Sequence, residues 1–198
     1  MRFPALPNIL LVLLAIVAAS PQIARAHCDG MDGPVVQAAR KALESGNVNL
    51  VLIWVQKQDE PAIKQAFQST LAIRRLSPEA KQLADTYFFE TLVRIHRAGE
   101  GAPYTGLKPA GRDLGPAIPA ADRALKEKSP EALQKLLTDT LQDSLREHFA
   151  RVSSQANVNP DDVEAGRAYV KEYVEFIHFA ERLYQASTTP AHGHAEEP

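Results

Sequence analysis

Three helix-start signals constrain the fold of this chain more than any other feature of its sequence. Ser77-Pro78-Glu79 and Ser129-Pro130-Glu131 each combine a capping hydroxyl, a proline suited to the first turn and an acid near the positive end of the helix dipole. Pro160-Asp161-Asp162 opens a third segment in a similar way. Together with a segment that Asp59 caps, these signals predict four long helices, over residues 60–75, 78–98, 130–152 and 160–186.

Four long helices are typical of a four-helix bundle. We therefore predict an all-α fold, a four-helix bundle with additional short helices near 34–45, 50–58 and 120–128. Residues 50–55 also have the propensity of a buried strand, but the chain offers no second strand to pair with them, so we favour a helix. The last helix, 160–186, is apolar around most of its circumference, which predicts a central position.

The first 26 residues have the layout of a secretory signal peptide. Met1-Arg2 supplies a positive start, residues 9–19 are almost entirely apolar, and Ala24-Arg25-Ala26 fits a small-x-small cleavage pattern. We predict that residues 1–26 are removed and that the protein is periplasmic or secreted. The apolar run is shorter than the roughly 20 residues that span a bilayer, so we expect no stable membrane insertion after cleavage.

Composition narrows the class of partner. Residues 27–186 are expected to form one helical domain and residues 187–198 a disordered tail. The net charge of −2 lacks the basic excess of nucleic-acid-binding proteins, so we expect no nucleic-acid partner. The single cysteine, Cys28, excludes an internal disulfide framework. A small-molecule substrate or a metal ion is the expected partner, and a homo-oligomer is compatible with the sequence.

Cleavage after Ala26 would place a group of metal-ligating residues at a new N-terminus. His27 would then offer an α-amine and an imidazole to one ion, and Cys28 a thiolate and a backbone amide. These donors favour Cu(II) or Ni(II). Asp29 and Asp32 add carboxylates, either as ligands or as acceptors that orient the ligands. The alternative is a trimmed N-terminus that binds nothing.

His-Cys-Asp at a processed N-terminus, ahead of a helical bundle, resembles the nickel-hook superoxide dismutases. Their hook begins His-Cys-Asp-x-x-Cys, with ligands from the histidine and from both cysteines. His27, Cys28 and Asp29 match the first three positions, whereas Asp32 stands where the second cysteine would be. The resemblance implies a redox metal and superoxide chemistry. The whole exported chain also looks like a bacterial family of uncharacterised exported proteins, a domain of unknown function.

Further candidate ligands lie on the predicted helices. His96 shares a helix face with Leu92 and is expected to point inward, as a core residue or as a ligand. Glu175 and His178 form a Glu-x-x-His pair on the last helix. Di-iron bundles use this spacing twice, and here it occurs once, so the pair could at most complete a single site with His96. Otherwise Glu175 and His178 belong to a solvated stripe.

The remaining candidates lie outside the long helices. Residues 99–119 form a glycine- and proline-rich stretch, and loops of this length are usually functional or mobile. Tyr104 within it could donate a hydrogen bond over a metal pocket or simply cover one end of the bundle. His192 and His194 could bind metal loosely or belong to a solubilising tail.

These features predict an exported metalloprotein that binds one Cu or Ni ion through its processed N-terminus. As an enzyme it would be a superoxide dismutase-like oxidoreductase, with Tyr104 or His96 as the proton donor. The alternatives are a periplasmic copper or nickel carrier without catalysis, and a structural or interaction module that holds no metal.

Overall fold

The computed structural model describes residues 27–189, and these are largely helical. The elements in chain order are η1 (His27–Asp29), α1 (Pro34–Ser45), α2 (Asn49–Leu52), η2 (Lys57–Asp59), α3 (Glu60–Ile73), α4 (Pro78–Gly99), α5 (Ala117–Glu127), α6 (Glu131–Ser154) and α7 (Val163–Thr188). Within this part of the chain there is no strand, only a bridge between Gly30 and Lys108. The prediction of an all-α fold is confirmed.

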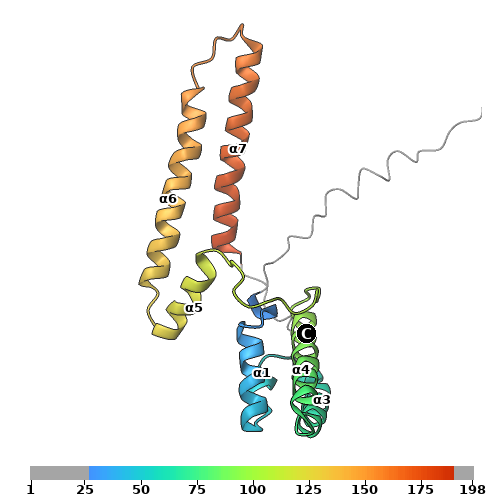
Figure 1. Cartoon of the computed structure of the whole chain (residues 1–198). Helices are drawn as coiled ribbons and strands as arrows, with labels where there is room; N and C mark the ends of the chain where they lie inside the picture. Colours follow the sequence, from blue (N-terminus) through green and yellow to red (C-terminus); the bar gives the residue numbers. More distant parts are fainter. Residues whose placement is uncertain (1–26, 190–198) are drawn as a thin grey trace, which may run out of the picture.

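The buried core lies where α1, α2, α3 and α4 meet (Figure 1). Phe67 of α3 and Phe88 of α4 form its centre, with ring centroids 5.5 Å apart. Both helices contribute residues at helical spacing, as amphipathic helices do. The core residues are Val35, Val36, Ala39, Ala42, Leu43, Val51, Ile63, Ala66, Phe67, Phe88, Phe89, Leu92 and Val93.

Arg74, the residue that ends α3, ties three core helices together. Its Nε and Nη2 donate to the carboxylate of Asp85 in α4, at 2.8 and 3.1 Å. Its Nη1 donates to the carbonyl oxygen of Leu43 in α1 at 2.6 Å. Bidentate charge-assisted bonds of this kind fix geometry as well as adding stability. They hold α4, on which the candidate site is built, in a defined position against α1 and α3.

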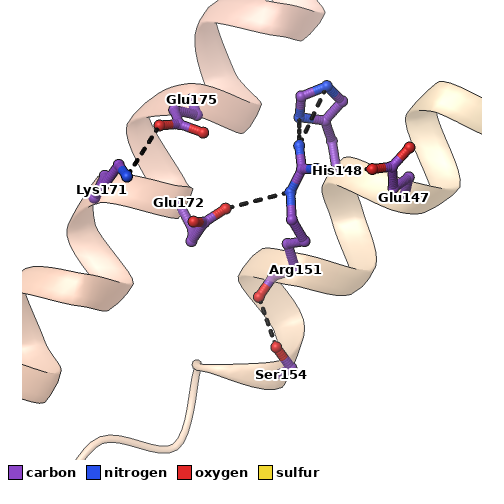
Figure 2. A network of polar contacts seen from close by, with 7 residues as sticks. All are labelled: Glu147, His148, Arg151, Ser154, Lys171, Glu172 and Glu175. Atoms are coloured by element: carbon purple, nitrogen blue, oxygen red, sulfur yellow. Dashed lines mark hydrogen bonds and ion pairs between the residues drawn. The ribbon is translucent and has the colours of Figure 1, made fainter.

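α6 and α7 form a long antiparallel hairpin, and α5 packs against α6 at its base (Figure 1). Figure 2 shows the polar contacts between the two long helices, where Arg151 of α6 reaches across to Glu172 of α7 with an Nε–Oε2 distance of 3.4 Å. His148 stacks on Phe179 with ring centroids 4.2 Å apart. Val152 is the one buried residue of these three helices.

The four-helix bundle is not confirmed. All four long helices exist within a few residues of the predicted bounds, but α3 and α4 pack together with α1, whereas α6 and α7 pack with each other. The long helices therefore form two groups and not one common core. The prediction that the last helix is central is wrong for the single chain, because no residue of α7 is buried.

The predictions for the two ends of the chain fall partly outside residues 27–189. The predicted signal peptide, residues 1–26, and the two tail histidines, His192 and His194, lie outside the described residues. α7 continues to Thr188, so the first residues of the predicted tail are helical. No helix between residues 27 and 189 is long and apolar enough to cross a membrane.

Candidate metal centre

The C-terminal end of α4 carries the candidate site. α4 begins where the sequence predicts, with Ser77 Oγ accepting a hydrogen bond from the helix backbone at 3.1 Å. Near its other end, His96 and Glu100 are four residues apart and therefore lie on the same side of the chain. Arg97 lies beside them and is only 8% exposed.

His96 is 2% exposed, and its contacts define which ring nitrogen can bind a metal. Its Nδ1 lies 2.8 Å from the carbonyl oxygen of Trp54. Because a carbonyl oxygen only accepts, Nδ1 carries the proton and donates it. In the neutral ring the lone pair is then on Nε2, which lies 3.3 Å from Glu100 Oε1. Metal-binding histidines commonly anchor their second nitrogen on a backbone carbonyl in this way.

Cys28 reaches the same place from the N-terminal turn. Two backbone hydrogen bonds of Lys108 join this turn to the 99–119 loop. The amide of Lys108 donates to the carbonyl oxygen of Asp29 at 2.8 Å, and the carbonyl oxygen of Lys108 accepts from the amide of Met31 at 2.9 Å. Gly33 closes the turn onto α1: a Cβ at this position would lie 2.2 Å from the carbonyl oxygen of His27. The loop that the sequence singled out therefore fixes the position of Cys28.

Cys28, His96 and Glu100 bring three different donors together. One ligand atom from each lies within 4.8 Å of the other two. Ligands of a tetrahedral ion with bonds of about 2.0–2.3 Å lie roughly 3.5 Å apart, so modest side-chain rotation would bring all three into coordination. His96 is buried and the other two residues are half-buried, which gives an ion a route to the site.

Arg97 balances the charge of two carboxylates at the site. Its Nη1 donates to Glu100 Oε2 at 2.8 Å, and its Nε lies 3.5 Å from Asp29 Oδ1. Burial raises the pKa of Asp29, and the positive charge of Arg97 opposes that rise. Because Arg97 holds Oε2 of Glu100, the other oxygen of that carboxylate is left facing His96.

The thiol of Cys28 is strongly protonated in the metal-free protein. Its pKa is raised from 9.0 to about 11, mainly by burial and further by the nearby carboxylates of Glu100 and Asp29. A thiol with such a pKa is a poor nucleophile at neutral pH, because the thiolate is the reactive form. The site therefore suits a metal ion that displaces the proton better than it suits covalent catalysis.

The other residues predicted at the N-terminus have different partners. His27 Nε2 lies 3.0 Å from Asp122 Oδ2 of α5, and His27 is not one of the three residues whose ligand atoms meet. Asp29 is buried against Arg97. Asp32 is exposed, and its Oδ2 accepts a hydrogen bond from the amide of Gly111 at 2.7 Å, which lowers its pKa. Asp32 therefore fastens the loop.

Neither of the two predicted residues on α7 belongs to the three-donor group. Glu175 and His178 are exposed on α7, where Glu175 lies 3.9 Å from Lys171 and His178 lies 3.1 Å from Glu181, as the solvated-stripe alternative expects. Tyr104 packs on the edge of the core, and both burial and the carboxylate of Glu90 raise its pKa. The tyrosine thus covers the core next to the loop.

Glu100 is the residue that the sequence reasoning missed. It follows α4 directly, and His96-x-x-x-Glu100 is the spacing that places two ligands one helical turn apart. Because a glycine-rich stretch begins at Gly99, the sequence pattern places this glutamate in the predicted loop and not at the end of the helix. A search for histidine–carboxylate pairs at i and i+4 would have found it.

Comparison with known proteins adds a family. A model described as a family of unknown function, DUF6448, matches residues 32–179. The matched segment includes His96 and Glu100 and begins four residues after Cys28. No curated protein and no solved structure shows significant similarity to the chain.

Proposed function

The chain belongs to the family of unknown function DUF6448, and we propose that this member binds one divalent transition-metal ion through Cys28, His96 and Glu100. The observation that carries the proposal is the meeting of three ligand atoms within 4.8 Å, from two segments far apart in the sequence. The histidine is oriented by the Trp54 carbonyl and the carboxylate by Arg97. Ligands held by a second layer of hydrogen bonds are typical of functional metal sites.

The donor set alters the expected ion. Copper or nickel was favoured by an α-amine and an amide nitrogen on His27 and Cys28, whereas the proposed group offers a thiolate, an imidazole and a carboxylate. Three such ligands with a fourth position open are compatible with Zn²⁺ and also with Cu²⁺. These two ions are the first to test.

Metal binding to the purified protein tests the proposal. After removal of metal with a chelator, equilibrium dialysis against Zn²⁺ or Cu²⁺ should give one tightly bound ion per chain by elemental analysis. The background is a His192→Ala, His194→Ala double variant, which removes loose binding by the tail. Cys28→Ser and Glu100→Gln should each weaken binding by at least about tenfold.

His178→Ala is the matched control, because it removes an exposed histidine on α7 and should leave binding unchanged. Equal binding by wild type and Cys28→Ser would overturn the proposal, as would a folded wild type that takes up no ion.

A hook at the processed N-terminus makes a different prediction. One extra residue placed before His27 converts the α-amine into a peptide amide. A hook that needs this amine would lose its ion, whereas the side-chain group of Cys28, His96 and Glu100 should retain it. Metal binding with and without the extra residue therefore distinguishes the two sites, although Cys28 belongs to both.

Superoxide chemistry is a second candidate function, favoured by the open position that three protein ligands leave. The His-Cys-Asp resemblance first suggested it, and it requires a redox-active ion. Copper-loaded wild type should then consume superoxide, and Cys28→Ser should not. A fully loaded protein without this activity would instead favour a copper carrier.

A further inference from the structure

α7 carries a row of large apolar side chains that the fold leaves exposed. Six large apolar side chains of this helix are between 42% and 72% exposed, namely Val163, Val170, Tyr173, Val174, Ile177 and Tyr184. They lie on one side of the helix, away from the side chains that meet α6, such as Phe176 and Phe179. α6 adds a neighbouring exposed stripe of Leu137, Leu141, Leu145 and Phe149.

The two stripes form one continuous face. Phe149 of α6 lies beside Phe176 of α7, with ring centroids 5.9 Å apart. A surface hollow in the hairpin is lined by Phe149 together with Tyr173 and Ile177. We call these ten exposed side chains the hairpin face. Each of them is between 41% and 72% exposed, so together they present an area of the order of the ~800 Å² that one partner buries in a standard protein–protein interface.

The spacing of the α7 side chains is symmetric about one point. This point is the bond between Tyr173 and Val174. Val170 and Ile177 lie equally far from it in the sequence, one on each side, and so do Val163 and Tyr184. A two-fold axis makes the same patch meet itself, so residue i of one copy faces residue j of the other and the reverse. An antiparallel contact between two copies of α7 centred on this bond would match every one of these side chains with another apolar side chain.

The register of the hairpin then places α6 as well. Because Phe149 lies level with Phe176, Leu141 lies near the level of Tyr184. In the antiparallel arrangement Tyr184 faces Val163 of the partner subunit, so Leu141 lies at the same height as that valine. The α6 stripe therefore extends the contact over the N-terminal half of the partner's α7.

We propose that two copies of the chain associate through the hairpin face, with α7 antiparallel to α7 about a two-fold axis between Tyr173 and Val174. The two hairpins then form a four-helix bundle with both α7 helices at its centre. A hairpin of 24- and 26-residue helices with Val152 as its one buried residue gains a core in this way. α7 becomes the central helix that its apolar circumference predicts.

Sedimentation equilibrium of the purified full chain tests the association. The wild type should be a dimer at micromolar concentration, and Ile177→Glu should be a monomer because it buries a charge in the contact, close to the axis. Leu83→Glu is the matched control, since Leu83 is 73% exposed on α4 and lies outside the hairpin face, and it should remain dimeric. A monomeric wild type would overturn the proposal, including one that attaches to phosphatidylglycerol vesicles instead.

Cysteine cross-linking tests the orientation even if a charged variant fails to fold. In a Cys28→Ser background, Val174→Cys should form a disulfide between two copies upon mild oxidation. Tyr184→Cys should not, because an antiparallel arrangement places the two positions roughly 30 Å apart at 1.5 Å per residue. Cross-linking at position 184 and not at 174 would overturn the arrangement, as would cross-linking at both or at neither.

Discussion

At the scale of single residues, the site depends on where protons are held. The Trp54 carbonyl keeps a proton on Nδ1 of His96, and burial keeps a proton on Cys28. An ion that binds the sulfur as a thiolate must displace the thiol proton, and an ordinary imidazole carries no second proton above pH 8. The cost of deprotonating Cys28 is therefore the main pH-dependent part of metal binding.

Cys28 should react slowly with alkylating reagents. With its pKa at about 11, well under 1% of this thiol is ionised at pH 8, so alkylation by iodoacetamide should be much slower than for an ordinary cysteine. The rate should rise about tenfold per pH unit between pH 8 and 10 and level off only above 11. Mass spectrometry of timed samples measures it, and a plateau near pH 9 would contradict the burial of the thiol.

The same thiol makes metal affinity depend on pH. Below the thiol pKa each bound ion releases one proton, so the association constant should rise about tenfold for each unit between pH 8 and 10. Competition with a chelator of known pH dependence measures this slope. A site made only of imidazole and carboxylate ligands would show no such slope in this range, because neither group titrates there.

Arg97 should contribute measurably to the stability of the fold. Replacement by methionine leaves the buried carboxylate of Asp29 and the carboxylate of Glu100 without their shared cation. Breaking a buried ion pair on one side costs about 3 kcal/mol, which urea unfolding can resolve. Arg146→Met, which removes an exposed arginine paired with Asp143, should change stability by less than about 0.5 kcal/mol. Equal losses in both variants would argue against a charge-balancing role for Arg97.

At the scale of elements, the N-terminal turn and the 99–119 loop act as one unit. Lys108 joins them through two backbone hydrogen bonds, and Asp32 adds a third contact at Gly111. This unit is what brings Cys28 to the end of α4. Disturbing the turn should therefore affect metal binding and stability together.

Gly33→Ala tests the turn. The new Cβ would lie 2.2 Å from a backbone oxygen that cannot move aside cheaply, so we expect a loss of about 2 kcal/mol in unfolding free energy and weaker metal binding. Gly166→Ala is the control, since a Cβ there meets no atom within 4 Å and alanine favours the helix. Unchanged metal affinity in Gly33→Ala would show that the turn does not position Cys28.

The helices were predictable from the sequence because their start signals are local. Ser77 caps α4 as expected. Asp162 caps α7, because its carboxylate accepts a hydrogen bond from the amide of Ala165. Their arrangement was not predictable, because it depends on contacts between distant segments. The same applies to the site: the sequence pointed to Cys28 and His96 separately, and only the fold shows that they meet, with Glu100 as the third member.

At the scale of the whole molecule, burial is unevenly distributed. Nearly all buried side chains belong to α1, α2, α3 and α4, whereas α5, α6 and α7 contribute only Val152. Elements with few buried contacts open more readily than the core. The stability of the hairpin should therefore depend on association, while that of the site should not.

Hydrogen exchange can separate these two parts. Amides of α3 and α4 should exchange slowly at every protein concentration. Amides of α6 and α7 should become more protected as the protein concentration rises, because association covers the hairpin face. Uniform protection that is independent of concentration would contradict a division into a self-sufficient core and a dependent hairpin.

X-ray absorption at the edge of the bound metal tests whether Cys28, His96 and Glu100 hold the ion. For the zinc-loaded protein we expect one sulfur ligand at about 2.3 Å and at least one imidazole nitrogen at about 2.0 Å. Cys28→Ser should lose the sulfur, and His96→Gln should lose the imidazole. A loaded wild type without a sulfur ligand, or a spectrum that neither variant changes, would contradict the claim.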